Sequence, residues 1–146
     1  MNMIFSRCLV TLGVCMTAAI VMAAGTVPGD AACPVSGKKC NAEKHVAFDG
    51  GQVYFCCATC QKVFEAQPAK FSAKAHHQMV STGQFVQQSC PIGGRPVKAG
   101  TQVNIGGVDV GFCCNRCKAK VQSASPEQQI TMVFGNLEKG FTPASK

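Results

Sequence analysis

The sequence is poor in acidic side chains and in charge as a whole. It has seven Asp and Glu residues against 14 Lys and Arg, and charged residues make up 14% of the chain, whereas soluble domains average about 25%. No Ser, His and Asp set and no pair of carboxylates stands at a recognisable catalytic spacing. We therefore predict that the protein is not an enzyme.

The chain also lacks the patterns of several whole classes of protein. Its hydrophobic content of 47% is too high for a disordered chain. Its periodicity fits neither collagen, nor a coiled coil, nor a multi-span membrane protein. With 146 residues, it has room for one domain or two small ones.

Residues 1–24 have the pattern of a signal peptide. One cation, Arg7, precedes an uncharged run from Cys8 to Ala24, and Val21-Met22-Ala23 places small residues where a signal peptidase cleaves. We therefore expect an exported protein, periplasmic or secreted, that has no membrane anchor after cleavage. The competing interpretation is an uncleaved anchor, because residues 8–27 are long enough to span a bilayer.

Cysteine is the residue that the sequence has in excess. Eleven are present, and nine remain once residues 1–24 are removed. Exported thiols are normally oxidised to disulfides or bound to a metal, and an odd number of cysteines cannot pair completely within one chain. The nine are Cys33, Cys40, Cys56, Cys57, Cys60, Cys90, Cys113, Cys114 and Cys117.

The chain contains an internal repeat. A shift of 57 residues aligns residues 33–60 with residues 90–117 without a gap, and 11 of the 28 aligned positions are identical. This identity indicates a duplication. Four cysteines coincide in the two copies, whereas Cys40 and His45 have no counterpart. The shared design therefore needs four cysteines per copy.

We expect an α+β fold of two tandem modules, residues 33–80 and 90–142, joined by a linker at residues 81–89. Proline and glycine after the first cysteine of each module favour a tight turn, and alternating apolar residues around glycine-containing tips favour β-hairpins. The predicted elements are turns at 33–37 and 90–94, hairpins at 46–55 and 103–112, first helices at 58–66 and 115–124, and second helices from Pro68 and from Pro126, the latter N-capped by Ser125.

A turn, a hairpin and a helix bring thiols from separate segments together, as small zinc-ribbon and treble-clef-like units do. Cys56 and Cys60 are four residues apart and Cys57 and Cys60 are three apart, so these side chains share one helix face. The hairpin returns Cys33 to that face. A thiolate-rich site selects Zn²⁺ or Cu(I), and we expect one ion per module.

Three motifs carry a resemblance to a known family. They are the Cys-x22-Cys-x3-Cys spacing in both copies, Cys-Pro-Val-Ser-Gly from Cys33, and Phe-Cys-Cys-Ala-Thr-Cys ending at Cys60. With them the chain resembles the TRASH and YHS group of small metal-binding domains, which implies metal trafficking, sensing or resistance. The ligands implied by the resemblance are Cys33, Cys56, Cys60, Cys90, Cys113 and Cys117. Cys57 and Cys114 stand where the family often has a non-ligand, and we count them as candidate metal-binding residues as well.

Several alternatives to transported metal stay open. The cysteines of each module are also consistent with disulfide staples, with zinc that only holds the module together, or with thiol redox chemistry at the Cys-x-x-Cys pairs. The βαβ units of a thioredoxin fold are missing, which argues against the redox alternative. Adjacent cysteines can bond to each other only through a strained ring, which argues against simple disulfides. As partners we expect the metal ion and a metal-delivering or metal-receiving protein, whereas the export signal argues against nucleic acid.

The sequence leaves the fourth ligand of each site open. Cys40 and His45 are candidates in the first module only. His76 and His77, near Met79, are candidates for an auxiliary soft-metal site, but such a pair on a polar helix face is more often solvated, and we predict solvation here. We also expect the two modules to pack against each other, because each hides little of its own apolar surface.

Overall fold

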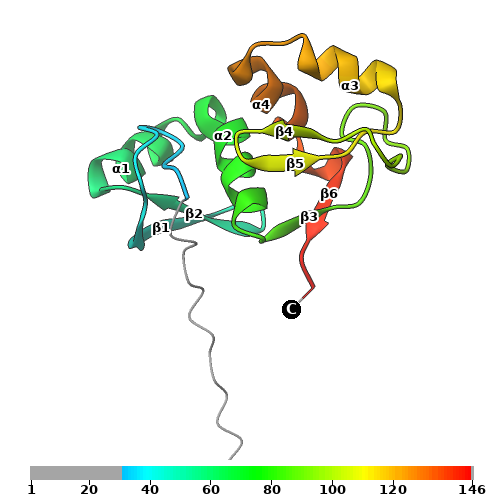
Figure 1. Cartoon of the computed structure of the whole chain (residues 1–146). Coiled ribbons are helices and arrows are strands. Elements are labelled where there is room, and N and C mark those ends of the chain that lie inside the picture. The colour runs from blue at the N-terminus through cyan, green and yellow to red at the C-terminus, as the bar shows by residue number, and fades with distance from the viewer. Residues whose placement is uncertain (1–30, 146) are drawn as a thin grey trace, which may run out of the picture.

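The computed structural model describes residues 31–145. The predicted signal peptide, residues 1–24, lies outside the described residues. Within 31–145 the fold is mixed α and β, with three two-stranded antiparallel sheets and four α-helices (Figure 1), which agrees with the predicted α+β class. None of these helices combines the length and the apolar character that crossing a membrane requires.

The first copy begins with the predicted turn and hairpin. The Gly37 N–H donates to the Cys33 carbonyl at 2.8 Å, and Gly37 has a φ of 73°. Strands β1 (Asn41–Phe48) and β2 (Gly51–Phe55) pair antiparallel. The two residues between them, 49–50, have φ values of 44° and 79°. Positive φ at both positions defines a type I′ turn, whose twist matches that of the strands.

The second copy repeats this arrangement with shorter strands. The Gly94 N–H donates to the Cys90 carbonyl at 2.8 Å. Strands β4 (Val103–Ile105) and β5 (Val108–Val110) pair antiparallel. Residues 106–107, both glycine, have φ values of 59° and 91°, so this hairpin also has a type I′ turn.

Two helices follow each hairpin. Helices α1 (Ala58–Ala66) and α3 (Asn115–Gln122) begin directly after the adjacent cysteines. The second helices are α2 (Pro68–Ser81) and α4 (Pro126–Phe134), each with proline in its first turn. The predicted N-cap of α4 is confirmed, because the Ser125 hydroxyl accepts a backbone N–H of the first turn in a capping box.

The segment between the copies contains regular structure. Strand β3 (Phe85–Gln87) lies within the predicted linker and pairs antiparallel with β6 (Phe141–Pro143), which follows the 3₁₀ helix η1 (Leu137–Lys139). Helices α2 and α4 also pack against each other, as Figure 1 shows near the centre of the molecule. The two copies therefore pack together, as predicted.

One hydrophobic core runs through both copies. Equivalent residues of the two hairpins are fully buried, namely Val53 and Phe55 in the first and Val110 and Phe112 in the second. Burying such a side chain contributes about 1.5–3 kcal/mol. The inward face of each hairpin is fixed in this way, and so is the position of the cysteine that follows it.

Candidate metal centres

Three sulfur atoms converge in the first copy. Cys33 in the turn, Cys56 just after β2 and Cys60 in the first turn of α1 place their Sγ atoms within 4.8 Å of one another. The Sγ atoms of Cys56 and Cys60 are 3.6 Å apart. Cys33 is buried and the other two residues are partly exposed, so solvent reaches the triad from one side.

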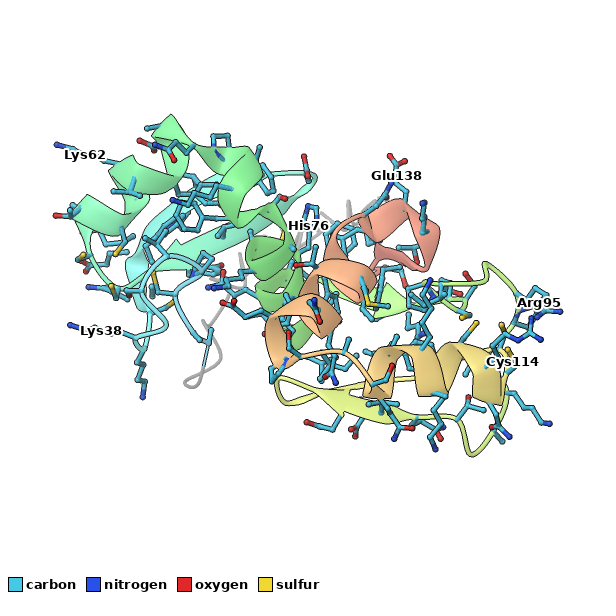
Figure 2. All side chains as sticks on the ribbon, turned by 90° about the horizontal axis from the view of Figure 1, so that it is seen from above. Lys38, Lys62, His76, Arg95, Cys114 and Glu138 are labelled. Carbon is cyan, nitrogen blue, oxygen red and sulfur yellow. The ribbon has the colours of Figure 1, made fainter. Side chains whose placement is uncertain are left out.

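The second copy has the same triad. The Sγ atoms of Cys90, Cys113 and Cys117 also lie within 4.8 Å of one another, and the last two are 3.8 Å apart. Figure 2 shows Lys38, in the turn of the first copy, and Cys114, beside the second triad, at opposite ends of the molecule. The triads are therefore two separate sites.

The local backbone explains why the sulfur atoms meet. The Cys33 N–H donates to the Lys38 carbonyl at 2.8 Å, and the Cys90 N–H donates to the Arg95 carbonyl at 2.9 Å, so both turns close in the same way. The type I′ hairpin then returns the chain to the turn. The cysteine four residues later lies on the same side of the following helix.

Cys57 and Cys114 lie beside the triads. They are the N-cap residues of α1 and α3. The Cys57 Sγ is 3.7 Å from the Cys56 Sγ, and the Cys114 Sγ is 3.9 Å from the Cys113 Sγ. Neither belongs to the sets of sulfur atoms that all lie within 4.8 Å. Six of the eight candidate cysteines thus form the triads and two are adjacent to them.

The backbone at the start of each helix favours ionisation of the Cys57 and Cys114 thiols. The backbone N–H of Cys60 lowers the pKa of Cys57, and the Cys60 thiol adds to this effect. The backbone N–H of Cys117 lowers the pKa of Cys114 to about 7. Unsatisfied N–H groups and the helix dipole both favour a negative charge at a helix start.

The thiols of the first triad differ in how readily they ionise. Burial raises the pKa of Cys33, but hydrogen bonds from the Ser36 hydroxyl and from nearby backbone N–H groups outweigh burial and bring this pKa to about 7. Partial burial and the neighbouring Cys56 and Cys57 thiols raise the pKa of Cys60 to about 12. A cation bound to all three sulfur atoms must therefore displace protons, which makes its affinity dependent on pH.

The two triads differ in the groups that surround them. The Ser36 Oγ lies 3.1 Å from the Cys56 Sγ. The equivalent residue in the second copy is Gly93, whose N–H donates to the Cys90 Sγ at 3.3 Å. A side-chain hydroxyl next to the first triad is thus replaced by a backbone N–H next to the second.

Arg95 places a positive charge beside the second triad. Interaction with the Cys113 sulfur, and then the charges of Cys113 and Cys114, raise the pKa of the guanidinium. Figure 2 shows Arg95 and Cys114 at the same end of the molecule. Lys38 occupies the equivalent position in the first copy. The second site therefore has a cation that stabilises its thiolates.

Cys40 and His45, the candidate fourth ligands of the first site, have other partners. The Cys40 thiol donates to the Tyr54 carbonyl at 3.1 Å. Burial raises the pKa of Cys40 to about 12, and the charges of Cys33 and Cys56 add to this effect. The His45 Nδ1 lies 3.1 Å from the backbone carbonyl three residues earlier. Neither residue belongs to a triad, and Cys40 is a protonated thiol at neutral pH.

The prediction that His76 and His77 form a solvated pair is wrong. His76 is 5% exposed, and its Nε2 and Nδ1 lie 2.8 Å from the Asp49 Oδ2 and 2.7 Å from the Phe134 carbonyl oxygen. The His77 Nε2 lies 3.1 Å from the Ile105 carbonyl oxygen. The pair joins α2 to the second copy, because packing of the copies buries a helix face that is polar in sequence.

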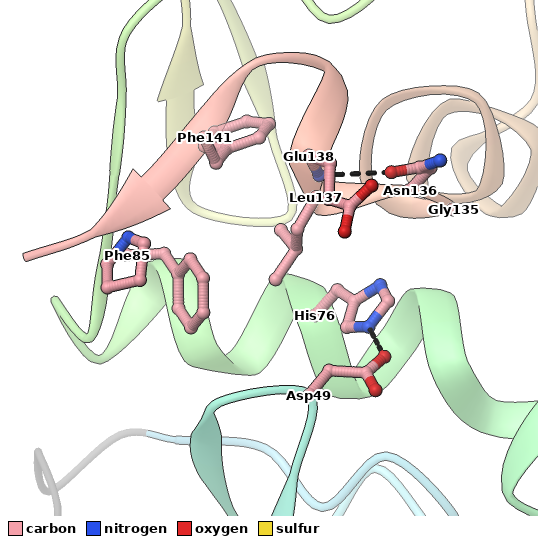
Figure 3. Close-up of a pocket in the computed structure, with 9 residues that line it drawn as sticks. Asp49, His76, Phe85, Gly135, Asn136, Leu137, Glu138 and Phe141 are labelled. Atoms are coloured by element: carbon pink, nitrogen blue, oxygen red, sulfur yellow. Dashed lines mark hydrogen bonds and ion pairs between the residues drawn. The ribbon is translucent and has the colours of Figure 1, made fainter.

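A pocket of about 540 Å³ lies next to His76. Figure 3 shows the hydrogen bond between His76 and Asp49 at this pocket, with Phe85 and Phe141 nearby. The residues that line it belong to the junction between the copies, and none of them is a cysteine. The pocket is therefore separate from both triads.

Glutamine side chains form hydrogen bonds with the segments that lead to the neighbouring cysteine pairs at residues 56–57 and 113–114. The Gln78 Oε1 accepts the Tyr54 N–H at 2.7 Å, and the Gln78 Nε2 donates to the Tyr54 carbonyl at 2.9 Å. Gln87 makes the same two bonds to Gly111, at 2.9 and 2.7 Å. Tyr54 and Gly111 are equivalent positions, but Gln78 and Gln87 are not 57 residues apart. The repeat therefore carries no signal for this role.

No family model matches the chain, and neither a curated protein nor a solved structure shows significant similarity to it. The resemblance to TRASH and YHS domains thus stays a prediction based on the cysteine motifs. The function has to be inferred from the geometry of the two triads.

Proposed function

We propose that the protein is an exported metal-binding protein that takes up one soft transition-metal ion, Zn²⁺ or Cu(I), in each triad. The observation that carries this proposal is the convergence of three sulfur atoms within 4.8 Å, at equivalent positions of both copies. Thiolate sulfur is a soft ligand that prefers these ions to Mg²⁺ or Ca²⁺. The metal ion is the cargo of the protein.

The number and spacing of the sulfur atoms favour metal over disulfides. The Sγ atoms of Cys56 and Cys60 are 3.6 Å apart and those of Cys113 and Cys117 are 3.8 Å apart, whereas a disulfide bond is about 2.05 Å long. A disulfide uses two sulfur atoms and leaves the third of each triad buried or half-buried without a partner. A single metal ion uses all three at once.

Three ligands also favour exchange of the ion over permanent storage. Structural zinc sites are usually closed by four protein ligands, whereas three leave an open position. Three thiolates suit trigonal Cu(I), or Zn²⁺ that takes its fourth ligand from solvent or from another protein. We therefore infer a role in metal trafficking, sensing or resistance, with a metal-delivering or metal-receiving protein as partner.

The remaining sequence features support the same proposal. The cysteine motifs support two TRASH- or YHS-like modules of the zinc-ribbon or treble-clef type, and the pattern of residues 1–24 supports export to the periplasm or beyond the cell. Three thiolates with Zn²⁺ or Cu(I) leave each site negative. The formal net charge of +7 then offsets the charge of the sites, and no catalytic role is proposed.

Native mass spectrometry of the protein purified from its own compartment tests the proposal, together with a count of free thiols. We expect reduced thiols and one bound ion per triad. Cys33→Ser and Cys90→Ser should each remove one ion, and the double variant should remove both. Cys40→Ser is the matched control, because it removes a partly buried thiol outside the triads, and it should retain both ions.

A different result would overturn the proposal. Metal-free protein whose mass is lowered by about 2 Da for each bridge identifies disulfides instead. Loss of metal from Cys40→Ser equal to that from Cys33→Ser places the site elsewhere.

A further inference from the structure

Each triad has a fourth sulfur beside it that is more exposed than the buried cysteine of the triad. In the first copy Cys33 is 2% exposed, whereas Cys57 is an exposed residue. In the second copy Cys90 is fully buried and Cys114 is partly exposed. We call Cys33 and Cys90 the inner thiols and Cys57 and Cys114 the outer thiols.

The start of the helix fixes the position of each outer thiol. Cys57 and Cys114 are N-cap residues with nearly identical extended backbones, φ −160° and ψ 166° in one and φ −164° and ψ 163° in the other. Their Sγ atoms lie 3.7 and 3.9 Å from the preceding triad cysteine. The same arrangement therefore occurs twice, although the residues around the two triads differ.

The other two cysteines of each triad are more exposed than the inner thiol, and one of them is next to the outer thiol. In the first copy these are Cys56 and Cys60, whose Sγ atoms are 3.6 Å apart and which are both partly exposed. An ion held by this pair has the buried Cys33 on one side and the exposed Cys57 next to Cys56. The outer thiol thus lies next to a triad sulfur, at a position that solvent also reaches.

We propose that Cys57 and Cys114 are exchange ligands, through which the metal ion enters and leaves the triads. This inference rests on the proposed function, and it assigns the two cysteines a kinetic role that differs from that of the triad.

The exchange is a substitution of ligands without a redox step. During release from the first copy, a bond forms between the Cys57 Sγ and the ion while the bond from the Cys33 Sγ breaks, and Cys56 and Cys60 keep their bonds. The proton lost by the Cys57 thiol goes to solvent, and the freed Cys33 thiolate takes one up. Donor atoms of the acceptor then replace the thiolates of Cys56, Cys57 and Cys60 one by one, and the oxidation state of the metal does not change.

Stopped-flow transfer of Zn²⁺ to an excess of a chromogenic chelator tests the proposal with the whole exported chain. The wild type is compared with Cys57→Ser, Cys114→Ser and the double variant, and equilibrium competition gives the affinity of each. We expect transfer from the double variant to be about tenfold slower, with affinity within about threefold of the wild type. Each single variant should show one fast and one slow phase. Cys40→Ser is the control and should transfer at the rate of the wild type.

The outcomes separate this inference from the proposed function. Wild-type protein that takes up neither Zn²⁺ nor Cu(I) overturns both, and protein that takes up only Cu(I) is compared with the variants by transfer of that ion. Wild type that binds Zn²⁺ while the double variant transfers it at the same rate overturns the exchange role alone. A double variant that loses affinity as strongly as Cys33→Ser also overturns it, because Cys57 and Cys114 would then be permanent ligands.

Discussion

Val97 fills the space above Gly111 that a side chain there would need. A Cβ at Gly111 would lie far inside van der Waals contact with the Val97 Cγ1. The same two positions in the first copy are Cys40 and Tyr54, where the smaller thiol donates to the Tyr54 carbonyl. The two differences between the copies are therefore coupled, and the loss of the aromatic residue in the second copy has a packing reason.

The contact predicts that even a methyl group at Gly111 destabilises the second copy. We expect Gly111→Ala to lower the free energy of unfolding by about 1–3 kcal/mol, which is the usual cost of overpacking. Val97→Ala in the same chain should restore most of this loss, and a double-mutant cycle from urea unfolding measures the coupling. Additive effects of the two substitutions would contradict the contact.

The hydrogen bonds between Gln78 and Tyr54 should make a measurable contribution to the free energy of unfolding. Gln78 is 2% exposed, so water does not replace its bonds, and we expect Gln78→Leu to cost about 1–3 kcal/mol in the free energy of unfolding. Gln84 is the matched control, because its amide bonds the N–H and carbonyl of Gln52 at an exposed position, at 2.6 and 2.9 Å. Gln84→Leu should cost less than about 1 kcal/mol. Equal losses in the two variants would show that burial of the amide is irrelevant.

Elements that belong to one copy were predictable because they depend on neighbouring residues. The glycine-containing tip at residues 49–50 favours a type I′ turn in any context, and Ser125 before Pro126 favours a helix start. The spacing of Cys56 and Cys60 likewise depends only on the helix pitch. Both triads follow from these local rules together with the 57-residue offset.

Contacts between the copies were not predictable, since they depend on which helix faces meet. The pattern of α2 places His76 and His77 on a polar face, and only packing against the second copy buries them. Strand β3 has three residues and pairs with β6, so it is too short to show an alternating pattern. The glutamine bonds are missed for the same reason, because Gln78 and Gln87 reach equivalent strands from different elements.

His77 predicts that stability falls in mildly acidic solution. Burial lowers its pKa from the ordinary value of 6.5, so between that lower value and 6.5 the unfolded chain binds more protons than the folded one. The stability that neutral His77 contributes is therefore fully present above pH 6.5 and is lost as the pH falls below 6.5. Urea unfolding of the wild type and of His77→Gln, which retains an N–H donor for Ile105, should converge in stability as the pH falls from about 7.5 to about 5.5. A constant difference between the two proteins would contradict this assignment.

We expect the second site to lose more metal affinity on removal of Arg95 than the first site loses on removal of Lys38. The Cys113 sulfur raises the pKa of the Arg95 guanidinium, whereas the Ser36 hydroxyl contacts the first triad. We expect Arg95→Gln, measured in a Cys33→Ser background that leaves only the second site, to weaken Zn²⁺ binding by about threefold at low salt. Lys38→Gln in the reciprocal Cys90→Ser background should have a smaller effect. Because Arg95 is exposed, salt should screen its contribution, so the two variants should become alike as ionic strength rises. A loss for Arg95→Gln that persists at high salt would mean that the side chain acts through packing and not through its charge.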